Sequence, residues 1–115
     1  MQQIIDITAE PKQELFVRLN NGKIIHLKLE YVDSQIGWFM DIDYDNIVST
    51  CHRITNAPNI IREKLKIFPF GIGCSVEDGQ EPFFIDDFFT GRASLYVLSK
   101  EDVEYVEKNY YGKIF

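Results

Sequence analysis

QELFVRLNNGKIIHLKLEY, residues 13–31, contains two runs of alternating apolar and polar residues around an Asn-Asn-Gly turn. Apolar residues fill every second position: Leu15, Val17 and Leu19 before the turn, and Ile25, Leu27, Leu29 and Tyr31 after it. A period of two places the apolar residues of a strand on one face and the polar residues on the other. Asn-Gly tolerates the positive φ angles of a tight hairpin turn. The stretch therefore predicts an antiparallel hairpin with one buried face.

Further strand signals lie on both sides of this hairpin, at residues 4–7, 38–43, 47–51 and 93–98. In residues 38–43, Trp38, Met40 and Ile42 alternate with Phe39, Asp41 and Asp43, and Tyr44-Asp45-Asn46 follows as a tight turn. This pattern predicts a second hairpin that joins residues 38–43 to residues 47–51.

The segments between residues 53 and 92 have weaker signals. Because Pro69 interrupts any long helical period, residues 60–70 favour a strand or a bent arm over a helix. Alternate glycines in residues 71–74 indicate a bulge or a close backbone approach. Residues 83–89 favour one helical turn capped by an aspartate.

The C-terminal part predicts a short helix. Ser99 is a suitable N-cap, and the acidic Glu101 and Asp102 follow in the first turn, as in a capping box. Val103, Val106 and Tyr110 recur at helical spacing, so we expect them to form the face that packs on a sheet. Gly112 is expected to end the helix.

These elements predict a mainly all-β fold, either a small antiparallel β-barrel or a sandwich, with one short C-terminal α-helix. The 115 residues suit a single domain, residues 1–115, with one hydrophobic core. The two cysteines, Cys51 and Cys74, are too few for a disulfide framework, and we expect both to be buried free thiols.

Charge and hydropathy exclude several classes of function. The net charge is −6, with 12 basic against 18 acidic residues, and this balance argues against nucleic-acid binding. No apolar run approaches the ~20 residues that span a bilayer. The first residues lack the basic and apolar regions of a signal peptide, so we expect a cytoplasm-like compartment.

The residues that could carry chemistry form no convincing site. Residues 41–45 place carboxylates at alternate positions, as in a calcium loop, but Asn46 and His52 stand where glycine and glutamate are needed. The soft ligands lack the paired close spacing of zinc sites: His26, Cys51, His52 and Cys74. The acidic groups at residues 77–81 and 86–87 suit a solvated surface. We therefore expect no enzymatic activity, no metal and no cofactor.

Doubled aromatic residues are the more informative feature. Where two aromatics are adjacent on a strand, one of them faces away from the core, and exposed apolar patches usually mark interfaces. The alternative, in which both sheet faces are covered by the chain's own arm and helix, is equally open at this point. The expected partner-interface residues are Phe39, Phe83, Phe84, Phe88, Tyr111, Ile114 and Phe115.

The order of these segments resembles the baseplate plug proteins of contractile-tailed phages. The matching features are an Ile-rich N-terminal strand and the following runs: Pro11-x-Gln13-x-Leu15-Phe16-Val17-x-Leu19, Ile25-x-Leu27-x-Leu29-x-Tyr31, Trp38-x-Met40-Asp41-Ile42, and Phe89-x-Gly91-x-Ala93-x-Leu95-Tyr96-x-Leu98 before Asp102-Val103. The similarity covers nearly the whole chain, although residues 53–80 show no pattern that can be aligned.

The resemblance implies a non-enzymatic structural component of the virion, located in the tail baseplate and assembled in the host cytoplasm. It implies several copies around the tail axis that plug or line the central hub and join it to tube proteins. The expected partners are the hub and tube-initiator proteins, with the spike and tape-measure proteins as further candidates. A function from another class also suits the size and acidity, namely a small cytoplasmic binding or inhibitor module for a bacterial or phage partner.

Overall fold

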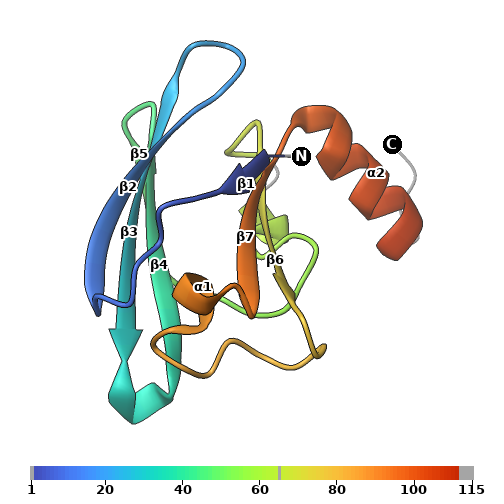
Figure 1. The fold of residues 1–115 in the computed structure, drawn as a ribbon. Coiled ribbons are helices and arrows are strands. Elements are labelled where there is room, and N and C mark those ends of the chain that lie inside the picture. The colour runs from blue at the N-terminus through green and yellow to red at the C-terminus, as the bar shows by residue number, and fades with distance from the viewer. Residues whose placement is uncertain (1, 65, 112–115) are drawn as a thin grey trace.

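In the computed structural model, which describes residues 2–64 and 66–111, two antiparallel sheets pack face to face (Figure 1). One sheet has four strands and the other has three, and within these described ranges no strand joins the two into a closed ring. Of the two predicted architectures, the structure therefore confirms the sandwich. The C-terminal helix lies on the side of the small sheet that faces away from the large sheet.

The large sheet confirms both predicted hairpins. Its strands follow the chain order: β2 (Lys12–Arg18), β3 (Ile24–Val32), β4 (Gly37–Tyr44) and β5 (Ile47–Arg53). The register pairs apolar residues with each other, for example Leu27 with Ile42 and Leu29 with Met40. All four of these side chains are buried, so the period of two does separate a core face from an outward face.

The two hairpin turns differ in type. In the first, the Leu19 N–H donates to the Lys23 carbonyl at 2.8 Å and the Gly22 N–H donates to the Leu19 carbonyl at 3.0 Å. Only Gly22 of this turn has a positive φ, 84°. This is a three-residue loop that ends in a left-handed glycine. In the second, Asp45 and Asn46 both have positive φ (51° and 66°), as a type I′ turn requires.

The small sheet combines the two ends of the chain. Its order is β1 (Gln2–Ile4), β7 (Ala93–Leu98) and β6 (Gly71–Val76). β6 carries the alternate glycines, and the close approach predicted there is real. A Cβ atom on Gly73 would lie 2.5 Å from the Pro58 carbonyl oxygen. Only glycine lets the preceding arm pair with this edge, where the Cys74 N–H donates to the Ala57 carbonyl at 2.9 Å.

Residues 54–64 and 66–70 belong to that bent arm, and the alternative of a strand there is wrong. A short 3₁₀ turn, Arg62–Lys64, interrupts the segment. Asn59 fixes the arm from inside the core, because its Oδ1 accepts the backbone N–H groups of Ile61 and Ile72, both at 3.2 Å. The side chain of one arm residue thus supplies bonds that a regular ladder would otherwise provide.

The helix α2 (Lys100–Tyr110) confirms the predicted capping box. The Ser99 hydroxyl accepts the Asp102 N–H at 3.2 Å, and the Asp102 carboxylate accepts the Ser99 N–H at 3.2 Å. Val103 and Val106 are buried as expected, but the prediction for Tyr110 is wrong, since it is 66% exposed. The end expected at Gly112 lies outside the described residues.

The buried position that was expected for Tyr110 belongs to Glu107. Its carboxylate accepts a hydrogen bond from Arg62 Nε at 2.7 Å. An ion pair between Arg62 of the arm and Glu107 therefore fixes the end of α2, where the apolar spacing predicted packing of the Tyr110 ring.

The helical turn α1 (Asp87–Thr90) exists, but its predicted aspartate cap is wrong. Asp86 occupies the N-cap and its side chain makes no capping bond. The side chain of the neighbouring Asp87 instead accepts the N–H of Phe84, three residues before the helix begins, at 2.8 Å.

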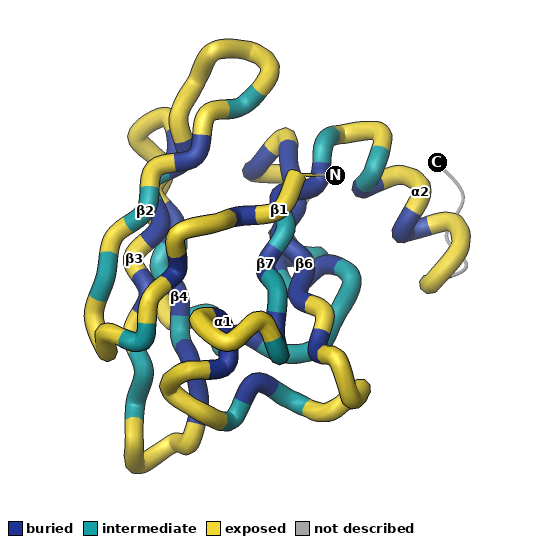
Figure 2. The backbone as a smooth tube through the Cα atoms, in the orientation of Figure 1, coloured by how far each residue is buried: buried dark blue, intermediate teal, exposed yellow. Residues whose placement is uncertain are grey.

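The core lies between the two sheets, where Figure 2 shows the buried residues along the facing strands. Trp38 is fully buried there. Cys74 is buried as expected, but the same prediction for Cys51 is wrong. The register of β4 and β5 shifts between Met40 and Ile42, and Cys51 sits in this bulge with a positive φ of 60°. The bulge turns Cys51 outward.

Candidate interaction surface

Arg92 organises the long loop that joins β6 to β7. Its guanidinium donates to Asp87 at 2.7 Å, to both carboxylate oxygens of Asp78 at 3.1 Å, and to the Glu81 carbonyl at 3.1 Å. Asp87 is buried, so it depends on this cation to compensate its charge. The pKa of Asp78 lies below its ordinary value, first because the Gln80 N–H donates to it and then because Arg92 does. One side chain thus fixes three points of the loop.

The large sheet fixes the same loop from the other side. The Tyr31 hydroxyl donates to the Phe83 carbonyl, and the Trp38 indole N–H donates to the Phe84 carbonyl at 3.3 Å. Burial raises the pKa of Tyr31, so its hydroxyl retains the proton that it donates. The backbone at residues 83–84 is therefore anchored to the large sheet, and through Asp87 it is linked to Arg92, the residue before β7.

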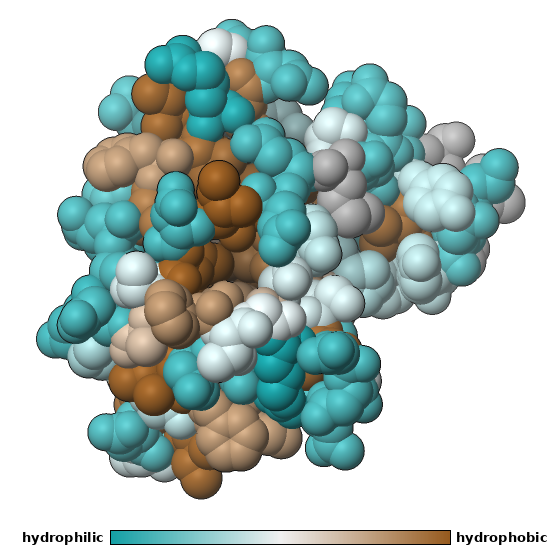
Figure 3. All heavy atoms as spheres, in the orientation of Figure 1, coloured by the Kyte–Doolittle hydropathy of each residue, from teal (hydrophilic) through white to brown (hydrophobic). Residues whose placement is uncertain are grey.

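These anchors expose a cluster of apolar side chains, which we name the loop patch: Phe84, Ile85 and Phe89. Phe84 is 59% exposed and Phe89 is 67% exposed. Figure 3 shows apolar surface around α1 and the loop below it, bordered by polar side chains. Rigid, exposed aromatic rings lose little conformational entropy on binding, which is the property of interface anchors.

The predicted interface residues fall into three environments. Phe84 is exposed and Phe83 is half-buried beside it. Phe88, in contrast, is only 8% exposed and packs edge-to-face on Trp38, with ring centroids 5.9 Å apart. Assigning Phe88 to the surface needs correction, because α1 turns it into the core and its neighbour Phe89 outward.

The other predicted residues lie away from the loop patch. Phe39 is half-buried on the outward face of β4, 5.4 Å from the Arg53 guanidinium. Tyr111 is half-buried after α2, with the Arg62 guanidinium 3.9 Å from its ring centroid. Ile114 and Phe115 lie outside the described residues. The structure therefore brings Phe83 and Phe84 together but separates them from Phe39 and Tyr111.

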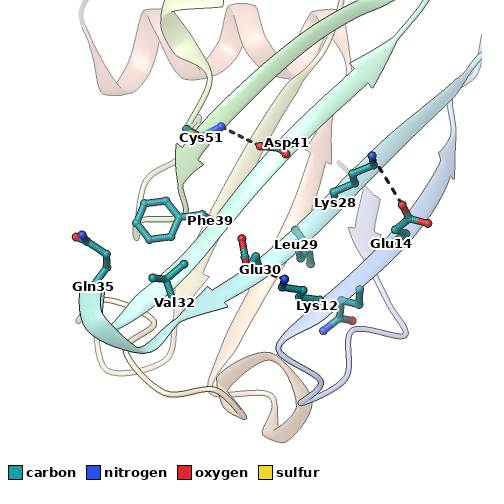
Figure 4. Close-up of a pocket in the computed structure, with 11 residues that line it drawn as sticks. Lys12, Glu14, Lys28, Leu29, Glu30, Val32, Gln35, Phe39, Asp41 and Cys51 are labelled. Carbon is teal, nitrogen blue, oxygen red and sulfur yellow. Dashed lines mark hydrogen bonds and ion pairs between the residues drawn. The ribbon is translucent and has the colours of Figure 1, made fainter.

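Phe39 borders a shallow hollow of about 740 Å³ on the outward face of the large sheet (Figure 4). Opposite charges approach each other across this hollow: Lys12 lies 3.6 Å from Glu30, and Lys28 lies 4.0 Å from Glu14. Asp41 accepts the Cys51 N–H at 2.9 Å. Two lysines face three partly exposed carboxylates in this lining, so the hollow offers no concentrated field for an ionic ligand.

A second exposed apolar group was missed by the sequence reasoning. It lies on the same outward face of the large sheet, on strands β2, β3 and β5. We name it the hairpin patch: Phe16, Ile24 and Val48. Phe16 is 68% exposed, and its ring stacks on His26 at a centroid distance of 4.4 Å. The alternation of side chains along a strand could have revealed it. Phe16 lies between Leu15 and Val17, which face the core, so its side chain must point the other way.

Other functions would need groups that could bind a metal, act as a nucleophile or cross a membrane. Within residues 2–64 and 66–111, no three His, Cys, Asp or Glu side chains are grouped as metal ligands. Burial raises the pKa of Cys74 to about 12, so this thiol stays protonated and is a poor nucleophile. No helix within the described ranges is long and apolar enough to cross a membrane.

Comparison with known proteins adds one positive finding. No curated protein matches the chain. The family model described as "Cyanophage baseplate Pam3 plug gp18" matches residues 1–101, a range that contains every strand of both sheets and ends in the first turn of α2. Since the match spans most of the 115 residues, the chain belongs to the family of phage baseplate plug proteins.

Proposed function

We propose that this protein is a structural component of a phage tail baseplate, where several copies close the distal end of the tail tube and join the central hub to tube proteins. The observation that carries the proposal is the family match over residues 1–101. The match covers the whole sandwich, so the proposal concerns the domain itself and not an appended segment.

The loop patch supports contact with neighbouring subunits. Tyr31 and Trp38 hold the backbone at residues 83–84, and Arg92 holds the Asp87 carboxylate that accepts the Phe84 N–H, so the exposed rings are positioned before any partner binds. The acidic balance suits the lining of a tube through which DNA passes, because like charges do not retain the phosphate backbone. Hub, tube-initiator, spike and tape-measure proteins are the proposed neighbours.

The test is assembly with substituted loop-patch residues. A phage that lacks the plug gene is complemented with the full chain carrying Phe84→Ala and Phe89→Ala together. We expect the yield of tails that contain the protein to fall by roughly 30-fold or more, the effect of losing about 2 kcal/mol at an interface centre. Tyr105→Ala, which alters an exposed ring on α2, is the matched control.

Circular dichroism of the purified variants shows whether the fold is retained. Normal incorporation of the double variant would remove the loop patch from the interface. Absence of the wild-type protein from purified particles, together with a soluble one-to-one complex with another protein, would instead favour the inhibitor module.

A further inference from the structure

The four outer strands of the sandwich differ in how their free edges are protected. β6 is covered by the arm, through bonds from Cys74 N–H to the Ala57 carbonyl and from Ile60 N–H to the Ile72 carbonyl. β1 has only three residues, and β5 is interrupted by the bulge at Cys51. Short strands, bulges and covering segments are the usual protections of a sheet edge. β2 has none of these three over its seven residues, and its outward face carries the charged side chains of Lys12, Glu14 and Arg18 instead.

In an antiparallel pair, the backbone groups of every second residue point to the neighbouring strand and those of the others point away. The Leu19 N–H bonds to the Lys23 carbonyl and the Tyr31 N–H bonds to the Pro11 carbonyl, so the odd-numbered residues face β3. The backbone groups of the even-numbered residues therefore face away: Lys12, Glu14, Phe16 and Arg18. Across the ranges that the structure describes, these groups have no hydrogen-bond partner.

We propose that a second copy of this chain occupies this edge, with β2 pairing antiparallel to the partner's β2 and Phe16 opposite the partner's Phe16. The two four-stranded sheets then form one continuous sheet across a two-fold axis. The contact is isologous, so each copy contributes the same residues. This inference concerns the free chain and does not rest on the proposed function.

Charge selects this register. It places Glu14 opposite the partner's Arg18, twice by symmetry. Among the described residues, Arg18 makes no ion pair in its own chain, and its guanidinium donates to the Gly22 carbonyl at 3.4 Å. Glu14 has only loose contacts, 3.5 Å to His26 and 4.0 Å to Lys28. Both charges are exposed and available to a partner.

The neighbouring registers that keep the even-numbered residues paired lose this match. A shift of two in one direction places Lys12 opposite the partner's Arg18, and a further shift of two places Glu14 opposite the partner's Glu14. A shift of two in the other direction places Phe16 opposite the partner's Arg18 and loses both ion pairs, and a further shift of two places Arg18 opposite the partner's Arg18. Like charges directly opposite each other destabilise a strand pair.

Apolar contacts agree with the same register. On the core side, the half-buried Leu15 lies opposite the partner's Val17, so the core continues across the axis. On the outward side, the exposed Phe16 ring, already stacked on His26, meets the partner's Phe16. Aromatic cross-strand pairs stabilise a sheet.

Sedimentation equilibrium of the purified full chain tests the pairing. We expect a monomer–dimer equilibrium with a Kd below about 1 mM, which corresponds to a modest association energy. Arg18→Glu and Glu14→Arg, each alone, place like charges opposite each other and should raise the Kd at least tenfold. The double variant Glu14→Arg/Arg18→Glu restores opposite charges and should return the Kd to near the wild-type value.

Cross-linking tests the register. In a Cys51→Ser background, Phe16→Cys places two thiols opposite each other at the axis and should give a disulfide-linked dimer under mild oxidation. Lys12→Cys is the control, because in this register the two residues are eight positions apart, roughly 27 Å at ~3.4 Å per residue. A monomer at all concentrations up to ~1 mM, single charge reversals that leave the Kd unchanged, or equal cross-linking at both positions would each overturn the proposal.

Discussion

At the scale of single residues, the loop patch depends on one cation. Arg92→Gln leaves the buried carboxylate of Asp87 without a compensating charge and releases Asp78. We expect a clear fall in the thermal unfolding midpoint measured by circular dichroism, and faster proteolysis within residues 77–92. Arg18→Gln, which removes a cation that pairs with no carboxylate in the described part of its own chain, is the control. Equal midpoints for the two variants would contradict the anchoring role.

His52 gives the fold a pH dependence. Its Nε2 lies 2.6 Å from the Ser49 hydroxyl, and burial, with a smaller effect of Lys64, lowers its pKa below the ordinary 6.5. Because the folded chain resists protonation, the unfolded chain binds more protons as the pH falls below 6.5. The free energy of unfolding contributed by neutral His52 is therefore complete above that pH and declines below it.

Urea unfolding between pH 5 and pH 7.5 measures this effect. His52→Gln keeps a hydrogen-bonding group near Ser49 but cannot titrate, so the variant should lose part of the decline at low pH. His26→Gln changes the other histidine, on the outward face of β3, and serves as the control. An unchanged pH profile in the His52 variant would show that this histidine is not responsible.

At the scale of elements, the pairing between the arm and β6 rests on a missing side chain. Gly73→Ala forces a methyl group against the Pro58 carbonyl, so either the arm or the strand must shift. We expect a loss of about 1–3 kcal/mol in the free energy of unfolding, measured in urea, as for overpacked interiors. Ser75→Ala, at an exposed position of the same strand, should change it by less than ~0.5 kcal/mol.

The elements that the sequence predicts well are those whose signals are local. Alternation and turn residues within a few positions define β2 to β5, and the Ser99–Asp102 box starts α2. The arm is different, because Asn59 and Gly73 acquire their roles only when they meet in space. No periodic pattern in the sequence predicts that the Asn59 side chain will make hydrogen bonds that replace part of a strand ladder.

The candidate surface divides in the same way. The alternation of side chains could have identified Phe16 as exposed, because the sequence already placed it in a strand. For Phe88 and Phe89 the decision lies in how a single helical turn docks on Trp38, and that contact joins residues 50 positions apart. Sequence reasoning could therefore name the doubled rings but not choose between their members.

At the scale of the whole molecule, the loop patch and the β2 edge have different expected roles. Neighbours in a ring around a tail axis touch through two different surfaces, whereas the β2 contact uses the same surface twice. A contact between two β2 edges therefore belongs to the free chain and cannot join neighbours in a ring. We expect Arg18→Glu to weaken self-association in solution while particle yield stays near wild type.

The most direct test of the plug function is a cryo-electron microscopy reconstruction of the intact tail tip from the phage that encodes this chain. We predict density that fits the two-sheet sandwich at the distal end of the tail tube, in several copies around the axis, with Phe84 and Phe89 against neighbouring subunits. A fully accounted tail tip without this sandwich, in particles of normal infectivity, would contradict it.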